Sequence, residues 1–459
     1  MIARVIVFVL MMALGAATVQ AKGLRKVVSV DFTSTPAPTS DADILRTHTY
    51  SKAVVGYDDG STTEYPLSYN ILFNNTDKIG GSSNEAGRLY DVEGNAIVDL
   101  NGDPVVAETP DGNSLLSVEG KPFLVTHFEY DWILGNGKPA WKTEGWHGRM
   151  PMSMVLTDLK QSADGQLMAF KQRPIDFSSV NGLWTPCFAS QTPWNTHLGS
   201  EEDYELFYTK ASGLNRLSAA VRGLNALSKI YFKGKRRANP YHYGYITEVK
   251  VNGDGSTEVS KHYNMGRASW EQALVMPDRR TVYFGDDGNH VGFFMFVADT
   301  PGDLSSGTIY AARWNQTSDE GGGSADLGWV RLGRTSFDEA QRIINSGISF
   351  DDIFEYTLPR ANPKWKEAGF RAIRAGYSNN EYLKIKPGME KAAVLLETRR
   401  YAAYLGATTE FNKMEGVAVD PKAKHLYLAI SYIKRGMRRE KNAPFDHIRL
   451  KKLKAGAVY

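Results

Sequence analysis

The sequence contains one cysteine, Cys187, among its 459 residues. No disulfide can therefore form within the chain. An excess of either charge is also lacking, because the formal net charge is only +3. This balance argues against nucleic acid as the main partner, since nucleic-acid binding requires a basic stripe. We interpret the basic stretch from Lys434 to Lys454 as a solvated loop surface.

Motifs that mark other enzyme classes are missing as well. There is no Gly-x-Ser-x-Gly elbow and no Walker-type phosphate loop, so serine hydrolase chemistry and phosphate-loop chemistry have no support. The histidines show no metal-ligand spacing such as His-x-x-x-His, and we assign none of them to a site. The chemistry must therefore come from other residue types.

An apolar run opens the chain. It extends from Val5 to Ala17, follows Arg4, and precedes the small-x-small sequence Val19-Gln-Ala21. A bilayer requires about 20 apolar helical residues, so this run is too short to span one comfortably. We predict a signal peptide over residues 1–21, no later membrane segment, and export to the periplasm or the extracellular space.

The rest of the chain predicts an all-β fold with a few helical insertions. Short apolar or alternating runs are separated by Gly, Asn, Asp and Pro, and the 43 glycines fit many tight turns. Helical periodicity appears in two segments, Ser336 to Ser346 and Glu390 to Leu405. The clearest predicted strands are Leu67 to Phe73, Phe123 to Tyr130, Met154 to Leu159, Gly244 to Val251 and Val291 to Ala298.

An internal repeat specifies the fold further. Glu271 and Glu415 each begin an apolar strand, have a proline six residues later, and have a tyrosine six residues after the proline. Each unit therefore reads as a β-hairpin with a proline-initiated turn. A diverged third copy begins at Cys187 and has Pro193 at the same offset.

The spacing of these copies predicts a β-propeller. The three lead residues lie 84 and 144 residues apart, which fits two and three blades of about 40–45 residues. We predict one propeller domain over residues 22–459, with six blades and an incomplete last blade. Equivalent positions of different blades lie at one height about the axis, so Cys187, Glu271 and Glu415 should converge.

Converging acids and a thiolate indicate a metal site. Nine residues after each proline stand Glu202, Asp286 and Ile430, so further acids occur at a second repeated position. Two like charges 4 Å apart cost about 4 kcal/mol at an effective dielectric near 20, and cations are the usual compensation. A thiolate in the set also favours a transition metal. The alternative is that these acids only accept hydrogen bonds from turn N–H groups.

The same residues resemble the PhoX family of bacterial alkaline phosphatases. Three blocks carry the resemblance, and together they extend over roughly residues 120–435. They are Cys187 through Thr192-Pro-Trp194 to Glu202, Gly266 through Glu271 to Gly288, and Arg399 through Lys413-Met-Glu415 to Pro421.

The resemblance implies a phosphatase that hydrolyses small phosphate monoesters outside the cytoplasm, as a monomer. It implies a cluster of ferric iron and calcium in which a metal-bound oxygen attacks phosphorus. The candidate metal ligands are Cys187, Glu202, Glu271, Glu415 and Asp286. Lys413 stands where the family has an arginine and is the candidate phosphate contact.

Two departures from the family keep other functions open. Ser431-Tyr432 replace an acid or amide pair that helps to bind calcium in relatives, and lysine at 413 loses the bidentate fork of arginine. The chain also stops before further strands that relatives have. The alternatives are a calcium-stabilised scaffold propeller without catalysis, or a calcium-dependent propeller lactonase or phosphodiesterase.

Overall fold

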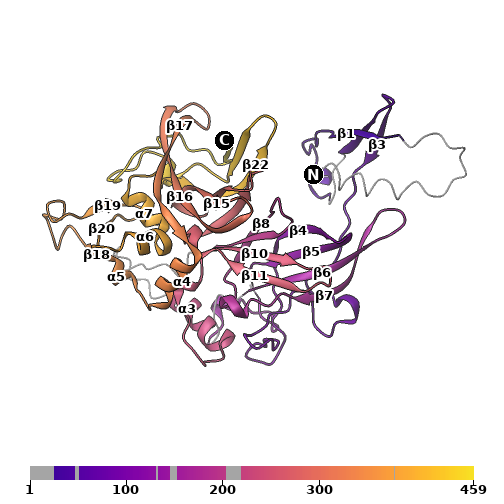
Figure 1. Cartoon of the computed structure of the whole chain (residues 1–459), viewed down its shortest axis with the longest axis horizontal. Helices are drawn as coiled ribbons and strands as arrows, with labels where there is room; N and C mark the ends of the chain where they lie inside the picture. Colours follow the sequence, from indigo (N-terminus) through magenta and orange to yellow (C-terminus); the bar gives the residue numbers. More distant parts are fainter. Residues whose placement is uncertain (1–24, 47–50, 131–132, 145–151, 203–218, 377) are drawn as a thin grey trace, which may run out of the picture.

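The computed structural model describes residues 25–46, 51–130, 133–144, 152–202, 219–376 and 378–459. The predicted signal peptide lies outside the described residues. The chain is mostly β, as predicted, and is arranged in several separate antiparallel sheets (Figure 1). Among the described residues, no helix is long and apolar enough to cross a membrane.

Four of the sheets are meanders, in which strands that follow one another along the chain pair with one another. The first contains β4 (Pro110–Val118), β5 (Lys121–Phe128), β6 (Ser153–Gln161) and β7 (Leu167–Pro174). The second contains β8 (Pro186–Gln191), β9 (His197–Glu201), β10 (Ile246–Val251) and β11 (Thr257–Lys261). The third contains β12 (Trp270–Val275), β13 (Thr281–Asp286), β15 (Phe293–Thr300), β16 (Asp303–Ser318) and β17 (Ser324–Ser336). The fourth contains β22 (Met414–Asp420), β23 (His425–Ile430) and β24 (Ala457–Val458).

The first strands of these sheets, which we name the inner strands, pack against one another in chain order. β4 contacts β8, β8 contacts β12, and β12 contacts β22. Glycines permit the close approach. A Cβ at Gly112 of β4 would lie 2.6–2.9 Å from Phe188 and Ala189, and one at Gly285 would lie 2.2 Å from the Met414 carbonyl oxygen. The first strands of the four sheets therefore lie side by side in one row.

Three smaller sheets accompany the meanders. β1 (Val27–Phe32), β2 (Lys52–Tyr57) and β3 (Thr62–Pro66) form a sheet drawn apart from the others at the upper right of Figure 1. β18 (Phe354–Thr357), β20 (Glu381–Ile385) and β19 (Arg371–Ile373) form a second. β14 (Asn289–Val291) pairs with β21 (Phe411–Asn412) and so ties the third meander to the segment before the fourth.

The helices are short, and most lie beside the third meander. They are α2 (Asp41–Ile44), α3 (Ala219–Ala226), α4 (Phe337–Asn345), α5 (Phe350–Ile353), α6 (Glu390–Leu396) and α7 (Thr398–Tyr404). The helix predicted over Ser336 to Ser346 is confirmed as α4, with these serines as its caps. The predicted helix from Glu390 to Leu405 is two helices, because Glu397 takes the non-helical angles φ −131° and ψ 42° between them.

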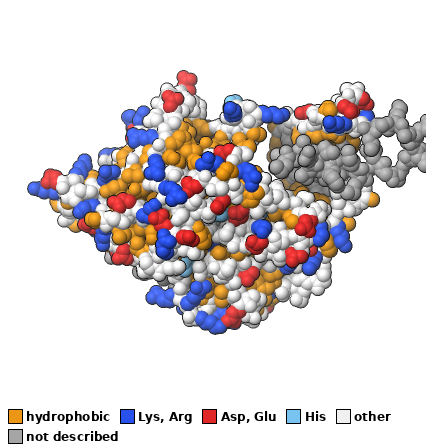
Figure 2. Space-filling model, in the orientation of Figure 1, with side chains coloured by type: hydrophobic (Ala, Val, Ile, Leu, Met, Phe, Trp, Pro, Cys, Tyr) orange, Lys and Arg blue, Asp and Glu red, His pale blue; other side chains and the backbone are white. Residues whose placement is uncertain are grey.

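The main hydrophobic core lies between the third meander and these helices. Trp270 packs edge-on against Phe284 and Phe294, with ring centroids 4.7 Å and 5.1 Å apart, and all three rings are fully buried. Such aromatic packing fixes the position of β12 relative to β13 and β15. On the molecular surface, Lys and Arg are interspersed with Asp and Glu on the face drawn in Figure 2, which agrees with the small net charge.

Two fold-level predictions were wrong. The run from Leu67 to Phe73 forms no strand, and Ile71 is 67% exposed, so the alternating pattern there has no sheet to join. The residue gaps between repeat copies were also misjudged. The 84 residues from Cys187 to Glu271 were expected to form two blades. They form a single sheet, β8–β11, because long insertions between its strands lengthen this part of the chain.

Candidate metal centre

Each inner strand carries a potential metal ligand at its second residue. These residues are Asp111, Cys187, Glu271 and Glu415. In all four strands the register with the next strand shifts immediately around this residue, which marks a β-bulge. A bulge turns a side chain out of its regular alternation and is common next to functional sites. Each of the four sheets therefore directs one side chain, from an equivalent position, out of the regular strand alternation.

A second position recurs directly after the second strand of each sheet. It holds Glu129, Glu202, Asp287 and Ser431. The strand pairing places this second position next to the first. In each hairpin, the residue just before the inner-strand ligand pairs with the residue just before the second position. The pairs are Pro110 with Phe128, Pro186 with Glu201, Trp270 with Asp286, and Met414 with Ile430. Each hairpin thus presents two side chains at the same end.

Packing of the inner strands joins these side chains into one row. Three groups have potential ligand atoms within 4.8 Å of one another: Asp111, Glu129 and Cys187; Cys187, Glu202 and Glu271; and Glu271, Asp287 and Glu415. Cys187 belongs to the first two groups and Glu271 to the last two. We name these seven residues the ligand row. The structure brings together four of the predicted ligands, namely Cys187, Glu202, Glu271 and Glu415.

The thiol of Cys187 lies at the middle of the row. Its Sγ is 3.4 Å from Glu271 Oε2 and 3.8 Å from Asp111 Oδ2, and the side chain is only 7% exposed. Hydroxyl groups support the neighbouring acids. Tyr130 donates to Glu202 Oε2 at 3.2 Å, and Ser431 donates to Glu415 Oε1 at 2.7 Å. These contacts orient carboxylates that must converge.

The predicted ligand Asp286 lies elsewhere. It is fully buried and accepts two hydrogen bonds from Arg399, one of them 2.6 Å long from Nε, and it also accepts the Gly292 N–H. The hairpin that begins at Glu271 is one residue longer than the one at Cys187, so Asp287 is the equivalent of Glu202. A shift of one residue turns a strand side chain to the opposite face. Asp287, which we missed, occupies the place expected of Asp286.

Substitutions at the two aspartates separate their roles. We expect Asp286→Asn to lower the free energy of unfolding by about 3–5 kcal/mol, because it removes the carboxylate charge from the buried ion pair with Arg399. Metal content per folded molecule should stay unchanged. Asp287→Asn should instead reduce metal content with a smaller effect on unfolding of the metal-free protein. Denaturant unfolding and elemental analysis of both variants check this, and the reverse pattern would contradict the assignment.

Burial and neighbouring negative charges raise the pKa values of three groups in the row. Burial, together with the charges of Asp287 and Glu415, raises the pKa of Glu271 to about 10. Burial and then the charges of Glu271 and Glu202 raise the pKa of the Cys187 thiol far above its ordinary value. Burial also raises the pKa of Asp111. Such shifts mark groups whose charged forms require a compensating positive charge.

Lys413 supplies one such charge at the end of the row. Its Nζ lies 2.9 Å from Asp287 Oδ1 and 3.3 Å from Glu415 Oε1, and its side chain is 31% exposed. Burial alone would lower the pKa of Lys413, but the charges of Asp287 and Glu415 raise it above its ordinary value. The amine is therefore charged at neutral pH and lies at the solvent side of the row.

Other buried acids in the protein are neutralised differently. Glu201 accepts a hydrogen bond from Lys261 at 2.8 Å, and Arg400 binds both Glu381 and Glu397, all of them almost fully buried. In the ligand row, Lys413 pairs with two of the six carboxyl groups, those of Asp287 and Glu415. The donor set fits metal ions: a thiolate suits a transition metal, and an all-carboxylate group suits a hard cation.

Sequence reasoning missed Asp111, Glu129 and Asp287. The hairpin of Asp111 lacks the proline that marks the other copies and turns instead through Glu119 and Gly120, which have φ of 50° and 77°. Its one available signal was an acid at the start of a strand, followed by a second acid just past the next strand. That signal becomes specific only after the other three hairpins have been superimposed on it.

One family of known proteins matches more than half of this chain. The family described as Alkaline phosphatase PhoX matches residues 157–452. No curated protein matches the chain. Among solved structures, the chain is similar to Pseudomonas fluorescens PhoX in complex with vanadate, a transition state analogue, at 18% identity and a TM-score of 0.49. That match covers 79% of this chain and 64% of the Pseudomonas chain, so this chain spans about 64% of the length of that PhoX.

Two putative 6-phosphogluconolactonases are more distant neighbours. The one from Bacteroides uniformis has 10% identity and a TM-score of 0.23, with 94% of this chain and 96% of that chain covered. The one from Bacteroides fragilis has 9% identity and a TM-score of 0.21, with 83% of each chain covered. The family match, by contrast, includes Cys187, Glu202, Glu271 and Glu415 and extends over more than half of the sequence. The chain belongs to the PhoX alkaline phosphatase family.

Proposed function

We propose that this chain is an exported, metal-dependent phosphatase that hydrolyses small phosphate monoesters at the ligand row. One observation carries the proposal: four separate hairpins supply three overlapping groups of buried and half-buried ligand residues, and the ligand atoms within each group lie within 4.8 Å of one another. Membership of the family supports the same activity. Carboxyl groups that crowd together at buried and half-buried positions are costly to ionise unless positive charge compensates them.

The donor types divide the row between two kinds of metal. We propose ferric iron at the two groups that share Cys187, because a thiolate ligand favours a transition metal. We propose calcium at Glu271, Asp287 and Glu415, because hard cations prefer carboxylate oxygens. Glu271 belongs to both kinds of group, so its carboxylate would be within reach of either metal.

The chemistry follows from the charges near the row. When bound, such ions neutralise phosphate oxygens and make water a nucleophile at mild pH. Lys413 lies at the exposed end and would orient the phosphate and oppose the negative charge that develops on its oxygens. Ser431 and Tyr130 would hold Glu415 and Glu202 in fixed orientations. The buried side of the row excludes bulk water from these contacts.

The role of Lys413 gives a direct prediction. We expect Lys413→Met to lower kcat/KM for a phosphate monoester by about 100-fold, because a preorganised charge at the transferring group is lost. Metal content should stay within the error of the wild type. Lys413→Arg should keep most of the activity, since its planar fork can bind two phosphate oxygens. Full activity of Lys413→Met would contradict the assigned role.

The function itself is tested by metal analysis combined with turnover of a chromogenic aryl phosphate. Iron and calcium in purified protein, with hydrolysis of the ester that ceases when the metals are removed, support the proposal. Metal without turnover of any phosphate monoester would overturn it.

A calcium-stabilised scaffold without catalysis is the second candidate. The observation that favours it is the contact of Lys413 with both Asp287 and Glu415, which commits the amine to neighbouring acids. Calcium without iron would support this scaffold or a lactonase. Hydrolysis of a sugar lactone with no hydrolysis of phosphate esters separates the lactonase from the other two.

The remaining predictions are part of the same proposal. We propose that the four meanders are blades of a propeller, because their inner strands pack in chain order around the row. The count of six blades and the single domain over 22–459 stay predictions. We also propose a cleaved leader over 1–21, a periplasmic or extracellular location, and a monomer that binds neither nucleic acid nor membranes.

A further inference from the structure

The segment after β23 borders the exposed end of the ligand row. Ser431 donates its hydroxyl to Glu415, and its N–H donates to the Lys413 carbonyl oxygen at 3.2 Å. The next residue, Tyr432, places its hydroxyl 3.4 Å from Asn289 Oδ1, two residues beyond Asp287. The phenol of Tyr432 is therefore part of the wall beside Lys413.

Two cations stand on this wall. Lys434 holds its Nζ 3.7 Å from the centre of the Tyr432 ring, and its N–H donates to Asn412 Oδ1 at 2.9 Å. Arg435 is exposed and has an Nη1 contact of 3.5 Å with Ser378 Oγ. In the part of the chain that the structure describes, neither cation forms an ion pair with an acid. Their charge is available to a ligand.

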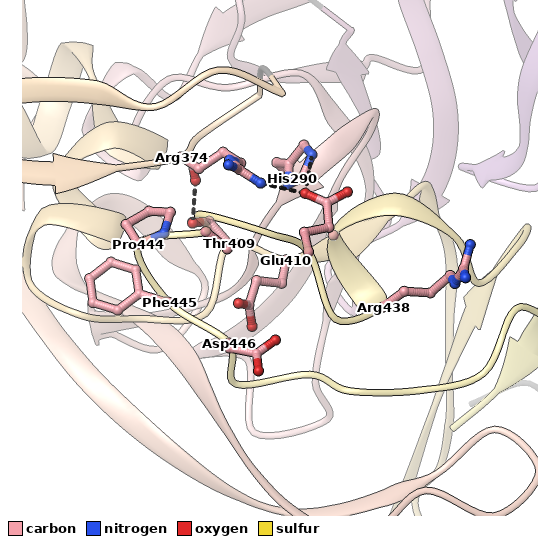
Figure 3. A pocket seen from close by; sticks show the side chains of 11 residues that line it. His290, Arg374, Thr409, Glu410, Arg438, Pro444, Phe445 and Asp446 are labelled. Atoms are coloured by element: carbon pink, nitrogen blue, oxygen red, sulfur yellow. Dashed lines mark hydrogen bonds and ion pairs between the residues drawn. The ribbon is translucent and has the colours of Figure 1, made fainter. Parts of the chain in front are cut away.

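The segment from Ser431 to Arg435 is fixed by the residues that follow it. Gly436 packs closely against the β14–β21 pair, because a Cβ there would lie 2.5 Å from the carbonyl oxygen of Glu410, just before β21, and 2.8 Å from His290 Nδ1. Arg374 anchors the following residues through Glu440. Gly436 and Glu440 line a pocket together with Arg374, His290, Glu410 and Asp446. Figure 3 shows Arg374 beside His290 in this pocket, and Glu410 pointing towards Asp446.

Charge and position together define a subsite. We propose that Lys434, positioned by the Tyr432 ring and assisted by Arg435, selects phosphate monoesters whose alcohol part carries a second negative charge. A lysine side chain that already packs over an aromatic ring has few accessible rotamers. It therefore loses little conformational entropy when it binds an anion. This inference rests on the proposed function, since it concerns the leaving group of that reaction.

The test compares two esters that differ in one group, 3-phosphoglycerate with its carboxylate and glycerol 3-phosphate without it. Wild-type protein should prefer the carboxylate ester in kcat/KM. Lys434→Gln should reduce this preference at least about fivefold, through KM and not kcat, and should leave inhibition by inorganic phosphate unchanged. Lys422→Gln, which removes the same charge from the turn at the far end of the β22–β23 hairpin, is the matched control and should change none of these values.

Variants of Tyr432 test its positioning role. Tyr432→Phe keeps the ring and should keep the preference, whereas Tyr432→Leu should lose it as Lys434→Gln does. Hydrolysis of both esters with a preference that Lys434→Gln leaves unchanged would overturn the inference. If neither ester is hydrolysed, the proposed function fails, and the ratio of the two binding affinities measured by calorimetry on metal-loaded protein then decides the subsite in the same way.

Discussion

Replacement of Cys187 by alanine is expected to remove the transition metal from the protein and to lower phosphatase activity at least about 1,000-fold. The thiol belongs to two of the three ligand groups, so its loss opens both at once. Removal of the metal takes away both charge neutralisation and the nucleophile, each of which is a large contribution to catalysis. Elemental analysis and turnover of an aryl phosphate, measured on the same preparation, check the prediction.

Folding must be separated from ligand loss in this experiment. Cys187 is nearly buried, but alanine removes only one sulfur atom, so metal-free Cys187→Ala should unfold within about 1–2 kcal/mol of the metal-free wild type. Ser190→Ala is a suitable control, because Ser190 lies on the same strand and its hydroxyl donates to the Ala273 carbonyl oxygen and not to a residue of the ligand row. A Cys187→Ala variant that keeps its iron and its activity would contradict the proposed centre.

The metal-free protein is expected to lose stability as the pH rises from 7 to 9, and the metal-loaded protein is not. Glu271 has an ordinary pKa of 4.5 when unfolded and a pKa of about 10 when folded. The stability that this protonated carboxyl group contributes is therefore fully present below about pH 4.5 and is lost progressively as the pH rises towards 10. Between pH 7 and 9 one retained proton corresponds to a slope of about −1.4 kcal/mol per pH unit.

Glu271→Gln isolates this contribution. The amide cannot ionise, so the slope of the metal-free variant between pH 7 and 9 should be shallower than that of the wild type by about one proton. Burial also raises the pKa of Glu410 to about 7, but Glu410 contributes equally to the slopes of the wild type and the variant. Denaturant unfolding at several pH values measures the slopes. Equal slopes in wild type and variant would show that Glu271 is not protonated in the folded protein.

The repeat in the sequence predicted the convergence because it encodes a hairpin and not only a composition. A lead residue, a proline six residues later and a returning strand fix the length of the hairpin, and hairpins of similar length place their lead residues at equivalent points. Cys187, Glu271 and Glu415 therefore meet although they are far apart in sequence. The general β character followed in the same way from short runs and frequent turn residues.

The errors have one physical origin. Single extra residues and insertions change the structure, but they do not change the sequence pattern of strands and turns on which the predictions were based. One extra residue in the Glu271 hairpin moves the ligand position from Asp286 to Asp287. A tight turn without proline hides the hairpin of Asp111. Inserted segments make each gap between lead residues resemble several blades. None of these features changes hydrophobic periodicity, so only the pairing register of the folded chain reveals them.

The central claim is that a thiolate and carboxylates from four hairpins surround metal ions, and anomalous diffraction tests it most directly. Crystals of the purified protein should give an anomalous peak above the iron edge, within bonding distance of Cys187 Sγ and of carboxylate oxygens from Glu202 and Glu271. A well-ordered Cys187 with no such peak beside it, in protein that hydrolyses phosphate esters, would contradict the account.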